Sequence, residues 1–217
     1  MTAHLVFVHG WGFDAASWRP VQDELADFAC ETVDLGFFGC PAASRANGAE
    51  PIVAIGHSLG FLWLLHERPF AWRGLVSIAG MPRFTKAADY DRAVGGRVLD
   101  AMIRRFAGSP DETLSDFIRR AGCTRADNGK RIDPARLGEA LHWLKDWDAR
   151  DALSSERSPV LALFAEDDEI VPKAMSEDIF ACRRNTRLAT RAHGGHALPM
   201  TEPRWCAAQI REFVQCL

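Results

Sequence analysis

The sequence contains no apolar run that approaches the roughly 20 residues needed to cross a bilayer. Its first residues lack the basic, apolar and small-residue order of a signal peptide. It also lacks a strong charge of either sign, because the net charge is only −3. These absences argue against a membrane protein, a secreted protein and a nucleic-acid-binding protein. We therefore expect a cytoplasmic protein with neither a membrane nor a nucleic acid among its partners.

Metal-binding and redox motifs are missing as well. The six cysteines are scattered, with no C-x-x-C pair and no metal-ligand spacing, so we expect reduced thiols. There is no internal repeat and no low-complexity segment. The chain has 217 residues, of which 47% are hydrophobic, which is enough for one large core. These features predict a single domain over residues 1–217 and imply no metal or organic cofactor.

What the sequence does contain is the motif G-H-S-L-G at residues 56–60, between apolar runs at 51–55 and 61–65. A serine hydroxyl is a weak nucleophile unless a base can reach it, and a sharp strand-to-helix turn exposes the side chain of Ser58. Flanking glycines keep such a turn free of Cβ clashes, and the helix start supplies N–H groups for an oxyanion. The motif therefore predicts a nucleophile at Ser58, and we give its neighbour His57 no role.

Strands and helices alternate along most of the chain, which predicts a parallel sheet with crossover helices. The expected strands lie at residues 5–8, 30–35, 51–55, 74–79, 159–165 and 186–190. Helices are expected around 17–26, 173–182 and 202–214, besides the one that follows Ser58. Three amphipathic helices without a strand between them are expected at 93–106, 111–121 and 134–145. The fold class is therefore α/β, with an inserted helical segment at about 82–150.

A serine nucleophile needs a general base, and the base needs an acid that orients it. In strand-turn-helix enzymes the chain order is serine, then Asp or Glu, then histidine. The expected strand at 159–165 runs into the acidic stretch E-D-D-E, and the next strand is followed by a loop with two histidines. Asp167 and Asp168 are both eligible as the acid, and His193 and His196 as the base. The residues alone leave both choices open.

Taken together, these motifs resemble the α/β-hydrolase family. The motif at 56–60 is similar to the family's nucleophile turn, and D-E-I-V-P at 168–172 is similar to its acid turn, D-x-x-V-P. G-H at 195–196, with E-P six residues later, is similar to its histidine loop. The resemblance thus favours Asp168 over Asp167 and His196 over His193.

Membership of this family would imply a mostly parallel central sheet flanked by helices, with an inserted helical lid. It would also imply a serine hydrolase that acts on an ester, with Ser58, Asp168 and His196 as the catalytic triad. H-G-W-G at residues 9–12 resembles the family's oxyanion loop. The resemblance therefore places the oxyanion hole at the backbone N–H groups of Trp11 and Leu59.

Within the family, the chain most resembles the pimeloyl-acyl-carrier-protein methyl ester esterases of biotin synthesis. The likeness rests on H-G-W-G followed by Trp18, on F-I-R-R at 117–120, and on L-K and D-A-R at 144–150. It implies an acyl ester substrate presented by an acyl carrier protein. The implied substrate-binding residues are Trp11, Leu59, Phe106, Phe117 and His196.

Charge is unevenly divided between the insert and the rest of the chain. Residues 81–150 hold 14 basic and 11 acidic residues, whereas the remainder holds 12 and 18. Arg104-Arg105, Arg119-Arg120 and Lys130-Arg131 are the main basic pairs of the insert. Such a face would steer an acidic partner, and we expect Arg119 and Arg120 to bind the carrier protein. Alternatively, the arginines only keep the outer faces of amphipathic helices in water.

Three departures and three alternative functions accompany the resemblance. The family's usual leading strand pair is missing, the segment at 40–50 is short, and Phe61 stands where glycine often follows the serine turn. Phe61 would make the nucleophile pocket tighter. Because a fold does not fix a substrate, a general short-chain carboxylesterase and a C–C bond hydrolase are the alternative enzymes. A non-enzymatic ligand receptor that kept the triad is the alternative outside catalysis.

Overall fold

The computed structural model describes residues 3–44, 50–124, 131–180 and 183–217. Within these ranges six strands form one sheet in the order β2-β1-β3-β4-β5-β6, and all neighbouring strands are parallel. The strands are β1 (His4–Val8), β2 (Ala29–Val33), β3 (Ile52–His57), β4 (Gly74–Ile78), β5 (Val160–Ala165) and β6 (Thr186–Arg191). The expected parallel α/β sheet is therefore confirmed.

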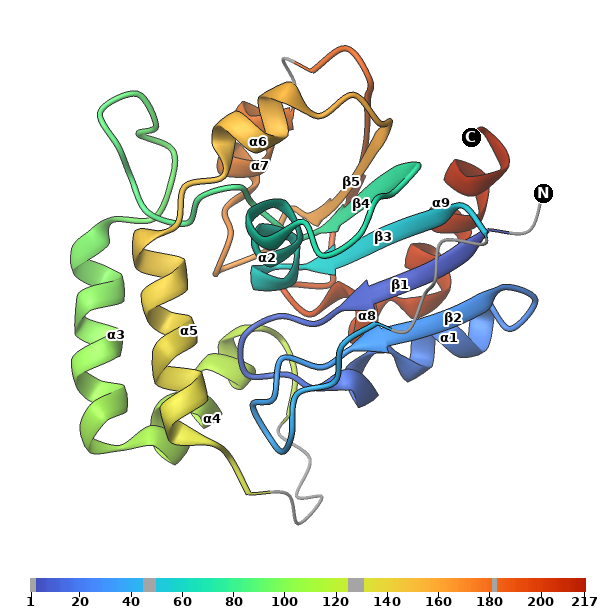
Figure 1. The fold of residues 1–217 in the computed structure, drawn as a ribbon. Coiled ribbons are helices and arrows are strands. Elements are labelled where there is room, and N and C mark those ends of the chain that lie inside the picture. The colour runs from blue at the N-terminus through green and yellow to red at the C-terminus, as the bar shows by residue number, and fades with distance from the viewer. Residues whose placement is uncertain (1–2, 45–49, 125–130, 181–182) are drawn as a thin grey trace.

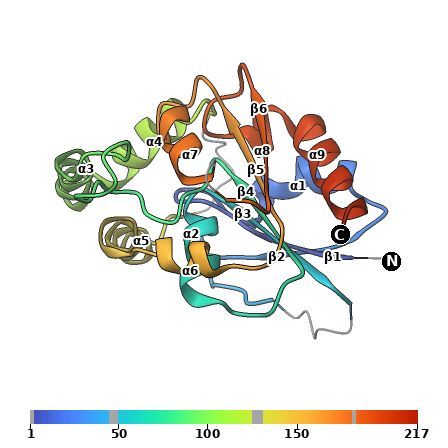
Figure 2. The same ribbon diagram turned by 90° about the horizontal axis from the view of Figure 1, so that it is seen from above.

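Helices cover both faces of this sheet (Figure 1 and Figure 2). In chain order they begin with the 3-10 helix η1 (Ala15–Trp18), α1 (Arg19–Glu24), α2 (Leu59–Glu67), α3 (Gly96–Gly108), α4 (Pro110–Arg120) and α5 (Pro134–Asp146). These are followed by α6 (Arg150–Ser155), α7 (Lys173–Phe180), α8 (Leu198–Thr201) and α9 (Pro203–Gln215). The short helices α6 and α8 were not expected from the sequence, because so few residues show no clear helical period. The helix expected around 17–26 corresponds to η1 and α1 together.

Alternating side chains of each strand enter two separate cores. On β1, Leu5 and Phe7 pack with residues of α1 and α9, whereas Val6 and Val8 pack with residues of α2. All four side chains are fully buried. A strand that is covered on both faces reads as a continuous apolar run, which is why the strands could be recognised without alternation.

The connection from β2 to β3 contains no helix in its described part, residues 34–44 and 50–51. Residues there form an isolated antiparallel bridge between Asp34 and Ala42. Nearby, the sheet carries polar side chains: His4 Nε2 lies 3.7 Å from Glu31 Oε2, and Ser44 Oγ donates to the same carboxylate over 3.0 Å. Residues 45–49 of the short segment noted in the sequence lie outside the described residues, and its residue Ser44 contacts the polar, partly exposed end of the sheet at Glu31.

The helical insert lies between β4 and β5. Its helices α3, α4 and α5 stand beyond the carboxyl ends of the strands, at the side opposite the two termini (Figure 1). Strands of a parallel α/β sheet present their loops at this edge, which is where such folds place ligands. The insert therefore lies over the edge at which Ser58 is found.

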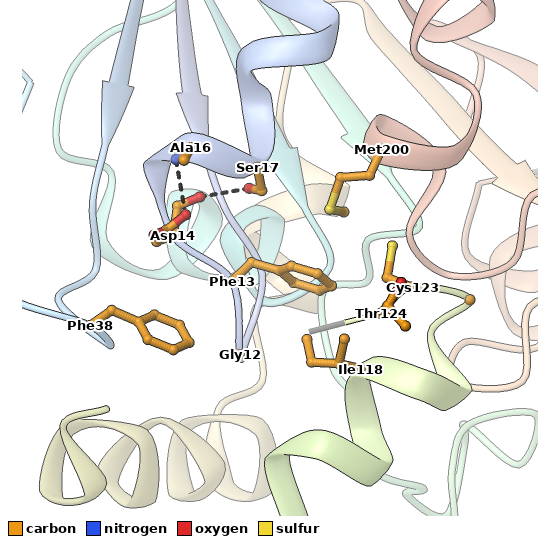
Figure 3. Close-up of a pocket in the computed structure, with 11 residues that line it drawn as sticks. Gly12, Phe13, Asp14, Ala16, Ser17, Phe38, Ile118, Cys123, Thr124 and Met200 are labelled. Atoms are coloured by element: carbon orange, nitrogen blue, oxygen red, sulfur yellow. Dashed lines mark hydrogen bonds between the residues drawn. The ribbon is translucent and has the colours of Figure 1, made fainter. Parts of the chain in front are cut away.

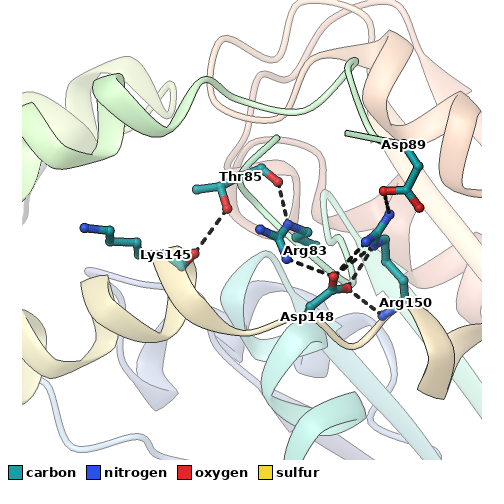
Figure 4. Close-up of polar contacts among 6 residues, drawn as sticks. All are labelled: Arg83, Thr85, Asp89, Lys145, Asp148 and Arg150. Carbon is teal, nitrogen blue, oxygen red and sulfur yellow. Dashed lines mark hydrogen bonds and ion pairs between the residues drawn. The ribbon is translucent and has the colours of Figure 1, made fainter. Parts of the chain in front are cut away.

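Ion pairs join the two ends of the insert (Figure 4). The Arg83 guanidinium donates to Asp148 Oδ2 over 2.8 Å, and Arg150 binds both Asp148 (2.8 Å) and Asp89 (2.9 Å). The Arg150 guanidinium beside Asp148 lowers the pKa of that carboxyl to about 2. The backbone is tied as well, because Ala149 N–H donates to Pro82 O over 2.8 Å. The D-A-R sequence at 148–150 thus fastens the exit of the insert to its entry.

Helix α2 can follow β3 only because its second residue has no side chain. A Cβ at Gly60 would lie 2.2 Å from Val8 O, and a Cβ at Gly56 would lie 2.4 Å from Phe61 Cα. Phe61 itself is fully buried and packs on Phe180, with ring centroids 5.9 Å apart. Phe61 therefore fills the core below the turn, and the expectation that it tightens the nucleophile pocket was wrong.

We predict that Gly60→Ala lowers the free energy of unfolding by about 3 kcal/mol, because the new methyl group meets strand backbone that cannot move aside. The matched control is Gly138→Ala in α5, where a Cβ would meet Phe106 at an ordinary 3.8 Å. That change should raise the free energy of unfolding by about 0.5–1 kcal/mol through helix propensity. Urea unfolding measures both, and equal effects of the two substitutions would contradict the close approach.

Candidate active site

Ser58 stands at the tip of the turn between β3 and α2. Its backbone has φ 51° and ψ −118°, a region that residues with a Cβ rarely adopt. The Ser58 N–H donates to Ile78 O on β4 over 2.9 Å, which helps to hold this conformation. The strand below and the helix above thus fix the serine at the carboxyl edge of the sheet, with 5% of its surface exposed.

The structure brings the three expected triad residues into one chain of hydrogen bonds. His196 Nε2 lies 2.8 Å from Ser58 Oγ, and His196 Nδ1 lies 2.9 Å from Asp168 Oδ2. Asp168 Oδ1 accepts hydrogen bonds from the N–H groups of Ile170 (2.7 Å) and Val171 (2.9 Å). Both the histidine and the aspartate side chains are fully buried. The carboxylate is thereby held at one oxygen while the other faces the imidazole.

Asp167 and His193, the alternatives that the residues left open, lie outside this chain. The His193 side chain is 88% exposed, and its Nδ1 lies 3.5 Å from Asp167 Oδ2. Asp167 Oδ1 instead accepts the Gly195 N–H over 2.8 Å. This second acid therefore supports the backbone of the histidine loop rather than the imidazole of His196.

His57 makes a contact that the sequence reasoning missed. Its Nε2 lies 2.9 Å from the backbone oxygen of His196, and its ring centroid lies 5.1 Å from that of His196. The side chain is almost completely buried, and this burial lowers the pKa of His57 to about 3. A carbonyl can only accept, so the neutral ring carries its proton on Nε2. The one signal in the sequence is a histidine at the end of an otherwise apolar strand.

The loop after β1 lies against the serine turn. His9 Nε2 accepts the Leu35 N–H over 2.9 Å, which ties this loop to the end of β2. A Cβ at Gly10 would lie 2.9 Å from His57 Nδ1 and 3.1 Å from Ser58 Cβ, so the backbone passes at the closest possible distance. This approach brings the following residue, Trp11, to the wall of the pocket that contains Ser58.

Leu59 lies on the other side of the serine, as the first residue of α2. The first N–H groups of a helix have no partner inside the helix, so they point outward at the turn. The Leu59 side chain is fully buried in the core and does not line the pocket that contains Ser58. Only the backbone of Leu59 can therefore meet a substrate, and the oxyanion role of Leu59 and Trp11 stays a prediction.

A mostly apolar pocket of about 290 Å³ opens beside Ser58. Side chains of the insert and of the turn after β5 form most of its wall, and Phe117 is among them, as expected from the sequence. The remaining apolar lining residues are Trp11, Phe84, Val94, Val98, Leu99, Met102, Leu144, Ile170 and Pro172. Two charged residues, Arg120 and Glu169, also line it. The pocket thus offers mostly apolar walls together with one basic and one acidic side chain.

Phe106, which we expected to line the pocket, is not among the described residues that form its wall. It is buried behind Trp11, with ring centroids 5.7 Å apart and nearly perpendicular planes. Phe106 and Phe117 both occupy inner faces of amphipathic helices, and helical periodicity cannot distinguish a core position from a pocket position. Phe106 therefore supports the pocket from outside its lining.

Trp11 connects the insert to the loop after β1. Its indole Nε1–H donates to Leu137 O on α5 over 2.9 Å, and its ring meets Phe117 edge-to-face at 4.9 Å. The Phe117 ring in turn lies 6.1 Å from the His196 ring. A displacement of α4 or α5 would therefore shift the loop after β1 and the His196 ring.

A second cavity, of about 440 Å³, is lined by residues of the loop after β1, of η1 and of α4 and the turn after it (Figure 3). Phe13, Ile118 and Met200 face it, and Ser58 does not line it. Gly12 also lines this cavity, and a Cβ there would lie 2.7 Å from Leu114 and 3.4 Å from Phe117. The nucleophile therefore serves the smaller pocket.

Arg119 and Arg120 point in different directions from the end of α4. The Arg119 side chain is 73% exposed and pairs with Asp116 over 2.8 Å. Arg120 Nη2 donates to Glu169 O over 3.3 Å, with its Nε 3.8 Å from the Glu169 carboxylate. Both arginines line a polar hollow of about 460 Å³ beside the histidine loop. Lys130, from the third basic pair, lies outside the described residues.

Among the described residues, no group of three or more His, Cys, Asp or Glu side chains could hold a metal ion. The cysteines that the structure describes there are all free thiols. None of the helices in these ranges has both the length and the apolar character needed to span a membrane.

Comparison with known proteins settles the family. Residues 5–209 match the pattern of the Alpha/beta hydrolase family. The chain belongs to this family. Its match covers nearly the whole chain, and it confirms the fold class and the enzyme class expected from the serine, acid and histidine motifs.

Two relatives are similar over nearly the whole of this chain. A Pimeloyl-[acyl-carrier protein] methyl ester esterase of Stenotrophomonas maltophilia (strain R551-3) is 30% identical over 239 residues, covering 97% of this chain and 92% of the relative. The Biotin biosynthesis bifunctional protein BioHC of Cellvibrio japonicus is 28% identical, covering 98% of this chain. This chain spans only about half of the bifunctional relative, 48% of that protein's length.

A solved structure agrees on the fold. An esterase from Exiguobacterium antarcticum aligns with a TM-score of 0.84 over 99% of this chain and 92% of its own. The two sequences are only 16% identical, so this likeness supports the α/β-hydrolase architecture alone.

We predict that Asp168→Asn lowers kcat for an ester by about 10⁴-fold, because an amide facing Nδ1 imposes the wrong tautomer on His196. Asp167→Asn is the matched control, since that carboxylate contacts the Gly195 backbone and the exposed His193 instead of His196. It should cost less than about tenfold, the order expected for a small shift of the loop. Steady-state kinetics with p-nitrophenyl butyrate measures both variants. A larger loss in Asp167→Asn would move the acid to that residue.

Proposed function

We propose that this α/β hydrolase is a serine carboxylesterase that hydrolyses the methyl ester of a pimeloyl chain carried by an acyl carrier protein. The observation that carries the proposal is the buried hydrogen-bond chain from Ser58 through His196 to Asp168. The names of the relatives support the choice of substrate, and the pocket beside Ser58 is compatible with it.

In the first half of the reaction, Ser58 Oγ attacks the ester carbonyl while His196 Nε2 takes the hydroxyl proton. The carbonyl oxygen becomes an oxyanion, which the backbone N–H groups of Trp11 and Leu59 stabilise. Asp168 stays ionised and stabilises the imidazolium. The imidazolium then gives its proton to the departing methoxide, and methanol leaves the acyl-enzyme.

In the second half, a water molecule attacks the acyl-enzyme while His196 again takes a proton. The tetrahedral intermediate collapses, Ser58 Oγ recovers its proton from His196, and the carboxylic acid of the chain leaves and loses its proton to water. The burial of His196 and Asp168 matters in both halves, because charge interactions are stronger where water is excluded. No metal is needed for either step.

The pocket suits a slender acyl chain. Its volume of about 290 Å³ lies just below the usual range for ligand sites, roughly 300–1,000 Å³. Methylene groups gain free energy when they leave water for walls such as Leu99, Met102 and Leu144. Arg120 and Glu169 would meet the part of the chain that leads back to the carrier. We infer that the methyl ester lies at Ser58 and the carrier outside the insert.

The basic insert would dock the carrier. Arg119 is largely exposed, Arg120 lies at the pocket, and both border the same polar hollow. Their present partners, Asp116 and Glu169, are acidic groups that a carrier's carboxylates could replace. Exposed ion pairs contribute only about 0.2–1 kcal/mol each, so several must act together.

The first test is growth of a biotin auxotroph that lacks its own pimeloyl-acyl-carrier-protein methyl ester esterase. The parent protein should restore growth without biotin, and Ser58→Ala should not, at equal expression on an immunoblot. If the parent fails to restore growth but hydrolyses p-nitrophenyl butyrate, the general carboxylesterase is favoured. If it does neither, the non-enzymatic receptor is favoured.

The second test concerns the insert. The double substitution Arg119→Glu with Arg120→Glu should raise KM for a carrier-bound methyl ester, and more so at low ionic strength, because charge steering is screened by salt. Hydrolysis of a small free ester should stay nearly unchanged. The measurement is KM for the two substrates at two salt concentrations.

The matched control is Arg204→Glu with Arg211→Glu on α9, a helix at the far side of the molecule from α3 and α5 (Figure 1). It makes the same change of charge and should leave KM for both substrates unaltered. Equal loss with both substrates in the insert variant would assign the arginines to the pocket or fold. An unchanged KM for the carrier-bound ester would show that Arg119 and Arg120 are only solvated surface charges.

A further inference from the structure

We propose that His57 is a positioning residue for the general base. Its Nε2–H, together with the insert, holds the peptide group between His196 and Ala197 in place. The inference rests on the proposed ester hydrolysis, in which His196 moves the proton. It assigns a task to the variable position of the G-H-S-L-G motif.

The clamp holds the peptide group between His196 and Ala197 at both ends. The His196 carbonyl accepts from His57 Nε2 over 2.9 Å, and the Ala197 N–H donates to Ala121 O over 2.9 Å. In a trans peptide these two groups point in opposite directions. The serine turn and the end of α4 therefore hold the same rigid plane from opposite sides.

The His57 ring is itself held on every side. Its centroid lies 5.4 Å from that of Phe13 and 6.3 Å from that of Trp18, and its Nδ1 edge faces the backbone of Gly10. The ring is buried to all but 1% of its surface. A rotation of the ring would strand its N–H group in apolar surroundings, which buried polar groups avoid. The donor is thus fixed in place before any substrate binds.

The neutral state of His57 also suits a residue that positions His196. A protonated His57 would place a positive charge 5.1 Å from the His196 ring, which must itself become positive during the reaction. The neighbouring rings, Phe13 and Trp18, carry no charge, and the other titratable groups near His57 are His196 and His9. The hydrogen bond is therefore made without opposing the imidazolium.

Loss of the donor should let the His196 backbone shift by a fraction of an ångström while the substrate pocket stays intact. His57→Leu keeps a buried apolar side chain but has no donor, and His57→Gln places an amide nitrogen near the position of Nε2. His142→Leu on the exposed side of α5 is the matched control. Kinetics with p-nitrophenyl butyrate should show kcat lowered by about 10- to 100-fold in His57→Leu. KM should be unchanged, and His57→Gln should recover most of kcat.

A second measurement does not depend on turnover or on the folding of a variant. Nitrogen NMR of the parent protein with ¹⁵N-labelled histidine should show His57 neutral, protonated at Nε2 and unprotonated at Nδ1. The opposite tautomer would overturn the clamp even if the parent hydrolysed no ester at all. An inactive parent would instead count against the proposed function, so the two failures can be told apart.

The kinetic outcomes are equally decisive. A parent-like kcat in His57→Leu would show that the hydrogen bond does not position the base. An equal loss in His57→Leu and His57→Gln would show that the ring acts by its shape alone. Either result overturns the proposal, whereas recovery in the glutamine variant with an unchanged KM supports it.

Discussion

The close approach of helix α2 to strand β1 is the constraint on which the site depends. Gly60 leaves room for Val8 O where any Cβ would lie 2.2 Å away, and Gly10 lets the next loop pass over His57 in the same way. Two glycines thus bring three chain segments to one point beside Ser58. Because the sheet is buried on both faces, this arrangement is backed by apolar packing rather than by the hydrogen bonds of the site. The turn at Ser58 can then keep its unfavourable backbone conformation.

The insert is joined to the site by packing contacts and hydrogen bonds that take no part in the proposed reaction. Trp11 reaches α5 through its indole N–H, Phe117 lies between Trp11 and His196, and Ala121 accepts from the peptide that follows His196. At its base, Arg83, Asp148 and Arg150 hold the entry and exit together. In the proposed reaction, the same helices would enclose the acyl chain, meet the carrier and steady the base. Substrate binding and positioning of the histidine would therefore be linked.

Sequence reasoning predicted the fold class and the order serine, acid, histidine because those signals are local: apolar runs, a glycine-flanked turn and loops at strand ends. The choice of Asp168 over its neighbour required the family resemblance, since two adjacent acids differ only in the direction of their side chains. Phe106 was misplaced because an inner helix face looks the same over a core as over a pocket. His57 was missed because its partner is a backbone oxygen 139 residues away, which no local pattern reports.

The central claim is that Ser58 is a nucleophile activated by His196, and covalent labelling tests it without any assumption about the substrate. A fluorophosphonate reacts with an activated serine, losing fluoride as the serine oxygen bonds to phosphorus. Intact mass spectrometry with peptide mapping should find one adduct per chain, on Ser58. The adduct should disappear in Ser58→Ala and form far more slowly in His196→Ala. A folded protein that stays unlabelled at Ser58, or that is labelled elsewhere instead, would contradict the account.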